Sequence, residues 1–353
     1  MRNERMAWMH TEEFLKAVTA LPGLTGNEGQ VAEYIAAAFR PYCDEVKIDK
    51  LNNVIAHKRG KGPKVMFCAH LDEIGLMVVK IEDDGCLRMG NVGGVDPRIL
   101  PGMRVQVYGK ETLFGVIGAK APHLLSKEES EKNYKREDLY IDLGLPEARV
   151  REMVRIGDLV TLEARFTALQ NGRYATKTAD DRACVAILYR AMQLLSDMKH
   201  KADVFFVATC QEEIGSYGAG MAGHSVDPDF GVALDVCHAV TPGAPKIRTH
   251  QLDSLVASQG PYLHPVLRAK LMEVAQLHNI QVQTAIVPRA TSTDADDLAI
   301  QRDGIPTILL ELPLKYMHTT VELFDMHTLE EGARLLAHFA AAVDDSWEET
   351  LWI

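Results

Sequence analysis

The chain has 353 residues, of which 47% are hydrophobic and 25% charged, and its formal net charge at pH 7 is -11. This length predicts one large domain with a smaller one beside it. The acidic balance argues against a nucleic-acid partner, because binding to phosphate backbones needs clustered lysine and arginine. No apolar run approaches the ~20 residues of a membrane span, and the first residues carry no secretory signal, so we expect a cytoplasmic protein without a membrane partner.

The six cysteines are scattered along the chain, with no CxxC pair. Three of them sit inside apolar runs, where a reduced cysteine behaves as a small hydrophobe. This pattern predicts a chain without disulfide bonds, as is usual in the cytoplasm.

The first 73 residues alternate helical and extended patterns. Apolar residues recur at helical spacing in 11–21 and 29–42, and the following strand patterns lie at 45–50, 53–58 and 64–69. After residue 74 the pattern of predicted elements changes. Residues 76 to about 165 consist of short β-runs broken by turns, among them a hairpin around Asp83-Asp84-Gly85 and a charged stretch that predicts a solvated loop or helix face.

From about residue 178 the alternation of helices and strands returns. We expect helices over 180–198, 265–279 and 329–343, and strands over 204–210, 230–235 and 306–312. Such alternation predicts a sheet covered by helices on both faces. The predicted fold class is therefore α/β, an α/β/α sandwich with a mostly parallel central sheet, interrupted by a smaller β-barrel-like insertion. The larger domain would be discontinuous, with residues 1–73 and 166–353, and the insertion would span 74–165.

Polar clusters follow the short apolar strands. His70-Leu71-Asp72-Glu73 follows the strand at 64–69, Glu212-Glu213 follows 204–210, and Asp235 ends 230–235; His318 lies a few residues beyond 306–312. Ligands bind at the carboxyl ends of strands in open α/β sheets. Buried strands do not end in carboxylates unless these are paired, solvated or bound to metal.

Histidines and carboxylates that converge in this way suit Zn²⁺ or a similar ion. Two ions ~3.5–4 Å apart need a bridging carboxylate and terminal ligands on each side, and they lower the pKa of a shared water. A further carboxylate, free of metal, must then move that water's proton. The adjacent acid pairs Asp180-Asp181 and Glu212-Glu213 offer such a division of roles, and the single-zinc motif HExxH is absent.

Each of these acid pairs and histidines could also have a purely structural role. Asp180-Asp181 at a helix start could cap the helix and compensate its dipole. Glu212-Glu213 could be a polar loop, and either His70 or His318 alone could be a structural histidine. The His70-x-Asp72 spacing favours a site more strongly, because Asp72 could orient a ligating His70.

Eight segments resemble, in order, the motifs of the M42 family of metallo-aminopeptidases, from about residue 10 to 345. They are HLDEIG (70–75), GGVDPRILPGMRV (93–105), GVIGAKAPHLL (115–125), KTADDR (177–182), EEIGSYGA (212–219), ALDV (233–236), STDA (292–295) and KYMHTTVE (315–322). The resemblance implies an enzyme that removes N-terminal residues from peptides with two divalent metal ions, zinc in the first place and cobalt as the alternative. Asp180 would bridge the ions, His70 and Asp235 would complete one site, and Glu213 and His318 the other.

The same resemblance implies that Glu212 is the general base and that Asp72 holds His70 in its ligating orientation. Asp294 is expected near the amino end of the substrate, although a structural role is an equal alternative. The larger domain would be the catalytic metallopeptidase domain, and the insertion would be a dimerisation domain. Family dimers often assemble into tetrahedral dodecamers, so we expect a homo-oligomer that acts on peptides.

The sequence departs from the family pattern at four positions, which are Ala179, Thr291, Ser292 and Cys237. None of these changes removes an expected ligand or the base, so they bear on the preferred side chain of the substrate and not on the reaction. Three alternative functions stay open at this point. They are a related metal-dependent deacetylase of N-acyl amino acids, a metal-free glycosidase with two carboxylates, and a non-catalytic assembly subunit.

Overall fold

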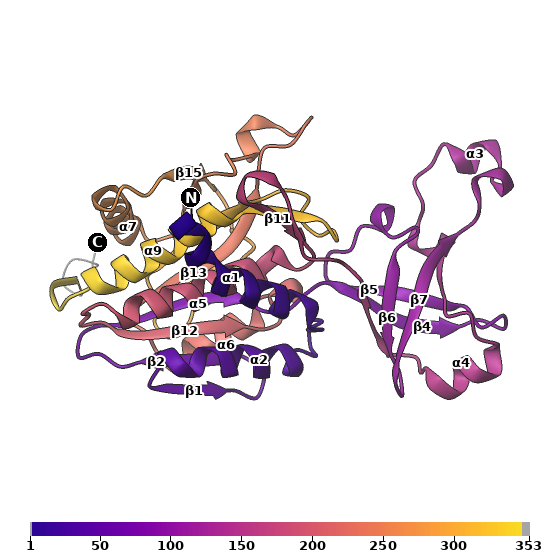
Figure 1. Ribbon diagram of the computed structural model, residues 1–353, viewed down its shortest axis with the longest axis horizontal. Helices are drawn as coiled ribbons and strands as arrows, with labels where there is room; N and C mark the ends of the chain where they lie inside the picture. Colours follow the sequence, from indigo (N-terminus) through magenta and orange to yellow (C-terminus); the bar gives the residue numbers. More distant parts are fainter. Residues whose placement is uncertain (1, 348–353) are drawn as a thin grey trace.

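The computed structural model describes the backbone of residues 2–347 and the side chains of residues 10–128 and 130–347. The molecule is elongated, with a larger part built of helices and strands at one end and a smaller barrel of strands at the other (Figure 1). The chain passes from the larger part into the barrel after residue 74 and returns after residue 162.

The larger part contains one sheet of eight strands, and its four central strands run parallel. Because parallel strands end at the same edge, whatever follows them is brought together there. The two strands at one edge pair antiparallel, and the last two at the other edge run parallel to each other but antiparallel to the centre. In spatial order the strands are β1 (Glu45–Ile48), β2 (Val54–Lys58), β12 (Asp203–Thr209), β3 (Lys64–His70), β13 (Phe230–His238), β16 (Thr307–Leu314), β14 (Leu255–Gln259) and β15 (Val282–Ile286).

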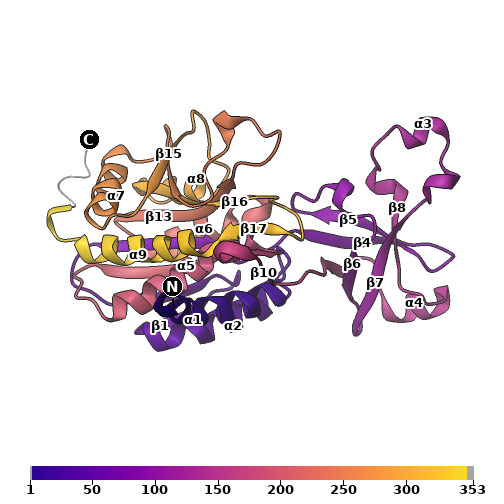
Figure 2. The same cartoon turned by 45° about the horizontal axis from the view of Figure 1, so that its top comes forward.

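Helices cover both faces of this sheet, which confirms the predicted α/β/α sandwich (Figure 2). The helices of one face share the main core with the sheet, and they are α1 (Arg2–Ala20), α2 (Gly29–Phe39), α5 (Ala179–Ser196), α7 (Pro265–Leu277) and α9 (Met326–Ala342). The opposite face is covered by α6 (Tyr217–Val226) and α8 (Asp294–Ala299). Helix α5 is apolar on nearly all sides because it lies between the sheet and the outer helices.

The smaller part is a closed barrel with its own apolar core, in which Leu76, Val105 and Ile141 are fully buried. Around the barrel the strands are β4 (Gly75–Ile81), β5 (Leu87–Val92), β8 (Leu139–Asp142), β7 (Thr112–Ala119), β6 (Arg104–Tyr108) and β9 (Leu159–Leu162). The short helices α3 (Lys127–Ser130) and α4 (Glu147–Met153) lie outside it. The predicted hairpin is β4–β5, and Gly85 in its turn has a φ of 87°, which favours glycine.

Three further strands form a small sheet beside the main one: β10 (Thr167–Ala168), β11 (Arg173–Thr176) and β17 (Glu322–Asp325). Strand β11 leads into α5, and β17 follows the loop that carries His318. Pairing of β11 with β17 therefore brings the start of α5 close to that loop. All six cysteines are free. Within residues 2–347, no helix is both long and apolar enough to cross a membrane.

Arg182, near the start of α5, is completely buried and ties several segments to one another. Its guanidinium donates to the carbonyl oxygens of Leu71, Val18 and Leu21 at 2.7–2.8 Å, and its Nη2 lies 3.5 Å from Glu73 Oε1. A fixed fork of donors suits such a set of carbonyl groups. Arg182 therefore fixes the end of β3 against the start of α5.

We expect Arg182→Leu to lower the free energy of unfolding by about 3 kcal/mol or more, because two buried carbonyl groups and a partly buried one would lose this donor. Urea unfolding followed by circular dichroism measures the change. Arg149→Leu is the control, since Arg149 is half exposed and, among the described residues, forms an ion pair with the exposed Glu152 alone; there we expect about 0.5 kcal/mol at most. Equal effects of the two substitutions would contradict this role of Arg182.

Candidate metal centre

The predicted site residues lie on segments that meet at the carboxyl edge of the parallel strands. His70 is the last residue of β3, and Asp235 lies three residues before the end of β13. Glu212 and Glu213 form a short helical turn after β12. Asp180 stands at the start of α5, and His318 lies in the loop between β16 and β17. The edge of the sheet thus gathers residues that are up to 248 positions apart, from His70 to His318.

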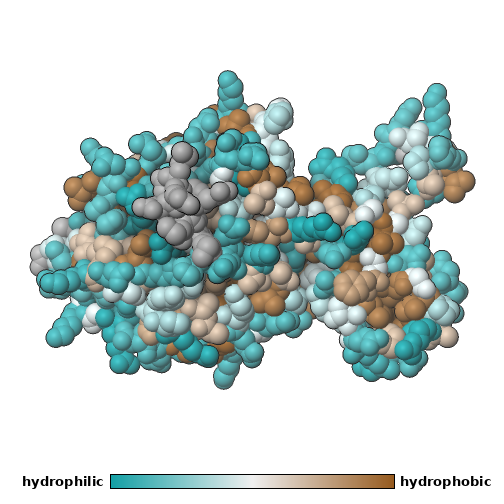
Figure 3. Space-filling model, viewed as in Figure 1, coloured by the Kyte–Doolittle hydropathy of each residue, from teal (hydrophilic) through white to brown (hydrophobic). Residues whose placement is uncertain are grey.

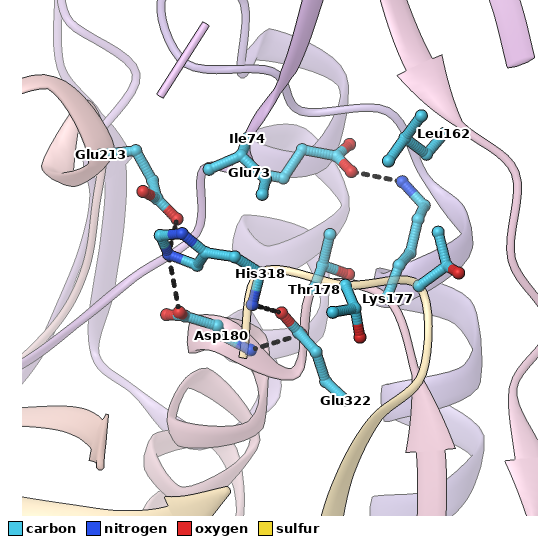
Figure 4. A pocket seen from close by; sticks show the side chains of 11 residues that line it. Glu73, Ile74, Leu162, Lys177, Thr178, Asp180, Glu213, His318 and Glu322 are labelled. Carbon is cyan, nitrogen blue, oxygen red and sulfur yellow. Dashed lines mark hydrogen bonds and ion pairs between the residues drawn. The ribbon is translucent and has the colours of Figure 1, made fainter. Parts of the chain in front are cut away.

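The carboxylate of Asp180 lies between the two histidines. Its Oδ1 is 3.1 Å from Nε2 of His70. Its Oδ2 is 3.3 Å from Nε2 of His318, a contact that Figure 4 shows. Burial raises the pKa of Asp180, but its hydrogen bonds with His318 and His70 outweigh this effect and hold the pKa below the ordinary value. Each oxygen of one carboxylate therefore faces a different imidazole.

His318 is fixed on both sides of its ring. Its Nδ1 lies 2.9 Å from the carbonyl oxygen of Gly94, in the segment after β5, while its Nε2 lies 3.4 Å from Glu213 Oε1. The hydrogen bonds with Asp180 and Glu213 raise the pKa of His318 to about 11. The contact with Gly94 links the barrel segment directly to this cluster.

Asp72 is fully buried, lies beside His70 and accepts hydrogen bonds from the turn at residues 212–213. Its Oδ1 lies 3.5 Å from Nδ1 of His70. Its two oxygens also accept hydrogen bonds from the backbone N–H groups of Glu212 and Glu213, at 3.1 and 3.3 Å, and Thr25 donates its hydroxyl at 2.7 Å. Asp72 thus lies where the sequence argument expects a residue that orients His70.

Asp235 joins His70 in a second group of polar side chains. One ligand atom each from His70, Asp181 and Asp235 lie within 4.8 Å of one another, as do those from His70, Asp180 and Glu213. Burial and the nearby Asp181 raise the pKa of Asp235 well above its ordinary value. Asp181 belongs to the acid pair Asp180-Asp181, but the sequence alone assigned it no separate role at the site.

Glu212 is close to the histidines and is not hydrogen-bonded through its carboxylate to any described residue. Its Oε2 lies 3.8 Å from His70 Nε2, and the side chain is 12% exposed. Burial, followed by the neighbouring acids, raises the pKa of Glu212 to about 10. The carboxyl group therefore faces the cluster without taking part in its closest contacts.

Asp294 starts α8 and is 1% exposed. Its Oδ2 accepts the hydroxyl hydrogen bond of Thr209, at the end of β12, whereas Oδ1 has no partner among the described residues. The side chain is close enough to His70 and Asp72 to interact with them electrostatically. Its expected place at the amino end of the substrate stays a prediction.

Glu322, the last residue of the KYMHTTVE segment, contacts the cluster although no role was predicted for it from the sequence. It is 3% exposed, and its two oxygens accept the backbone N–H groups of Asp180, at 3.1 Å, and of His318, at 2.8 Å (Figure 4). Glu322 therefore fixes the backbone of both residues. The sequence does show an acidic residue four positions after His318, but only the fold shows that this residue contacts the start of α5.

The four departures from the family pattern lie at the start of α5, in the turn before α8 and on β13. Thr291 and Ser292 donate backbone hydrogen bonds to the carboxylate of Asp296 and so close the turn before α8. Ser292 has a φ of 58°, a conformation that favours glycine. Ala179 is fully buried at the start of α5. Cys237 is half-buried on β13, two residues beyond Asp235.

The residues of this cluster fit divalent metal ions. Buried carboxylates outnumber the two histidines, and no ion pair within the described residues brings a lysine or arginine to Asp180, Asp235 or Glu213. Lys177 lines a small pocket beside Asp180, but its ammonium pairs with Glu73 (Figure 4). Imidazole nitrogen and carboxylate oxygen are the usual non-sulfur ligands of zinc. A bound cation would offset the negative charge of these carboxylates, with which no described lysine or arginine pairs.

Comparisons with known proteins agree with the fold and with the motifs. The profile of the M42 glutamyl aminopeptidase family matches residues 52–335. A lysyl aminopeptidase of Pyrococcus furiosus is 37% identical over 330 residues, which cover 92% of this chain and 94% of the relative.

Two solved structures are also similar throughout. The TET aminopeptidase of a marine-sediment thaumarchaeon superposes with a TM-score of 0.92 at 29% identity, covering 97% of this chain and 99% of the other. The TET1 peptidase of Pyrococcus horikoshii, described as assembling into a tetrahedron or a large octahedral shell, has a TM-score of 0.83 at 30% identity and covers 94% of this chain and 100% of the other. The chain belongs to the M42 family of aminopeptidases.

Proposed function

We propose that this aminopeptidase removes N-terminal residues from peptides with two divalent cations and with Glu212 as its general base. The observation that carries the proposal is the carboxylate of Asp180, whose two oxygens face His70 and His318 separately. A carboxylate in this position is suited to bridge two ions, each with its own histidine. Zinc is the expected ion, with cobalt as the alternative.

The remaining ligands follow from the same arrangement. Asp235 would join His70 on one ion, and Glu213 would join His318 on the other, because each lies beside its histidine. When bound, the ions would polarise the peptide carbonyl group and lower the pKa of a water molecule between them. Asp72 would keep Nε2 of His70 turned toward its ion through the contact at Nδ1.

Glu212 would move the proton. Its carboxylate is near the cluster and makes no hydrogen bond to the described residues, so it is free to accept a proton at Oε2 from the attacking water. The same oxygen would then donate that proton to the departing amine nitrogen. A nearby dication favours the ionised form of Glu212, which is the form a base requires.

The proposal is tested with a panel of aminoacyl p-nitroanilides and their N-acetylated counterparts, assayed on the metal-loaded chain. We expect hydrolysis only of the substrates with a free α-amine. Equal or faster cleavage of the N-acetylated compounds would instead identify a deacetylase-like amide hydrolase. Loss of activity on chelation, with recovery on addition of Zn²⁺ or Co²⁺, is expected in the same assay.

We further propose that residues 1–73 and 166–353 form the catalytic domain and that the barrel region, residues 74–165, serves dimerisation. Hydrophobic side chains gather on the visible face of the barrel (Figure 3). Phe114 and Val116 of β7 are 66% and 49% exposed, and they line a shallow groove with Leu143. An exposed apolar patch of this kind is typical of an interface between proteins. The shells described for the Pyrococcus horikoshii relative support a homo-oligomeric assembly here.

Placing a charge on this surface is expected to separate the subunits. For Phe114→Glu we expect the dimer to weaken by about 3 kcal/mol, roughly a hundredfold in Kd, because an unpaired carboxylate would be buried. Light scattering coupled to size-exclusion chromatography measures the mass. Leu277→Glu, at a 75% exposed leucine at the end of α7, is the control and should leave the mass unchanged. An assembly that tolerates Phe114→Glu would place the interface elsewhere.

A further inference from the structure

A row of polar side chains runs across three neighbouring strands at the edge of the sheet. In the pairing of β13 with β16, Asp235 lies directly opposite Glu311. Ala233 of β13 lies opposite Cys68 of β3, so that His70, two residues further on, is level with Asp235. Residues opposite each other on paired strands share one face of a sheet. Glu311 therefore extends the row of His70 and Asp235 by one strand, about 4.8 Å.

The row marks the boundary between the apolar core and the open edge of the sheet. One step below it on the same face, Ala233 and Leu309 are buried in the core that α8 covers through Leu298. One step above it lie Cys237, which is half-buried, and Pro313 opposite. The side chain of Glu311 thus leaves the sheet where the helical cover ends, beside the proposed metal ligands.

Glu311 is a buried acid without a cation. It is 8% exposed, and its Oε2 accepts a hydrogen bond from the hydroxyl group of Ser258 on β14. Its Oε1 accepts no hydrogen bond from any described residue, and Glu311 forms no ion pair within the described side chains. Burial raises the pKa of Glu311 to about 7, and the bond from Ser258 offsets this only in part. A buried carboxylate that has no partner in its own chain is suited to a cation brought by another molecule.

Its position also indicates which part of a substrate could bring that cation. With the ions bound as proposed, the scissile carbonyl group would lie near Asp180, His70 and His318, and the α-amine would lie next to that group. Glu311 lies one strand beyond Asp235, away from β3 and β12. A group bound there would have to extend from the α-carbon away from β3 and β12, as the side chain of the N-terminal residue would.

We propose that Glu311 is a specificity-determining residue that binds the cationic side chain of an N-terminal lysine or arginine. Oε1 would accept hydrogen bonds from the ammonium or guanidinium group, while Ser258 holds Oε2 in place. The inference rests on the proposed aminopeptidase function and adds a substrate class to it.

The test compares kcat/KM for lysyl, arginyl and leucyl p-nitroanilides in the metal-loaded full chain and in Glu311→Gln. We expect the variant to lose about tenfold to a hundredfold for the two basic substrates, because a charge-assisted hydrogen bond becomes a neutral one. The leucyl substrate should change by less than about threefold. Ser258→Ala is the matched control, since it alters the same pair but keeps the carboxylate, and it should retain the preference for basic residues.

A binding measurement makes the outcome independent of turnover. Lysinamide is expected to raise the melting temperature of the metal-loaded wild-type chain more than leucinamide does, and Glu311→Gln should abolish this difference. An equal loss of kcat/KM for all three substrates, or an unchanged ratio, would overturn the inference while leaving the aminopeptidase proposal intact. If no aminoacyl substrate is cleaved at all, the proposed function fails. In that case, equal increases of the melting temperature by lysinamide and leucinamide would overturn the inference as well.

Discussion

The substitution Glu212→Gln is expected to lower kcat by about 10²–10⁴-fold, the usual contribution of a general acid–base group. The amide has nearly the same shape as the carboxylate but cannot accept and return a proton. Because Glu212 makes no hydrogen bond through its carboxylate to the described residues, the change should leave the fold and the metal content intact. Steady-state kinetics together with metal analysis by mass spectrometry provide the two readouts.

Glu213→Gln is the informative comparison, because it makes the same chemical change at the adjacent residue. Glu213 Oε1 lies 3.4 Å from His318 Nε2, so we expect this variant to lose metal as well as turnover. Two neighbouring acids should therefore give different metal contents. A Glu212→Gln variant with near wild-type kcat would show that another group is the base, and one that loses metal would show that Glu212 is a ligand.

The substitution Asp180→Ala is expected to have the broadest effect on the site. Removing a carboxylate that faces both histidines would deprive both ions of a shared ligand, so we expect the metal content to fall from two ions per chain toward zero and activity to disappear with it. Metal analysis after dialysis measures the first effect. The melting temperature should also no longer rise on addition of Zn²⁺, because an ion that does not bind cannot stabilise the fold.

The exposed Asp303 offers a control, because Asp303→Ala should change neither the metal content nor the rise in melting temperature. Retention of both ions by Asp180→Ala would refute the bridging role.

The pH dependence of metal binding provides a further check on the wild-type chain. Hydrogen bonds with Asp180 and Glu213 raise the pKa of His318, and the proton it holds must leave before the ring can bind an ion. Metal affinity should therefore fall as the pH decreases.

Local patterns predicted most of the elements that build the sandwich. The apolar strands at 64–69, 204–210, 230–235 and 306–312 lie in the four central strands, because a strand covered on both faces must be apolar along its whole length. The hairpin of the barrel was equally visible, since its turn residues interrupt two extended runs. The outer strands β14 and β15 and the helices α6 and α8 were not assigned, because short elements carry weak periodicity.

The sequence by itself therefore determined the class of fold, the family and the polar residues at the strand ends, since each depends on neighbours along the chain. Only the tertiary structure decided which of these residues meet. The arrangement of β3, β13, β16 and α5 in space brings Asp180 close to two histidines and Glu311 beside Asp235. It also lets Glu322 accept hydrogen bonds from the backbone of Asp180 and His318. The physical reason is that side-chain periodicity fixes the face on which a residue lies, whereas pairing between distant strands fixes its neighbours.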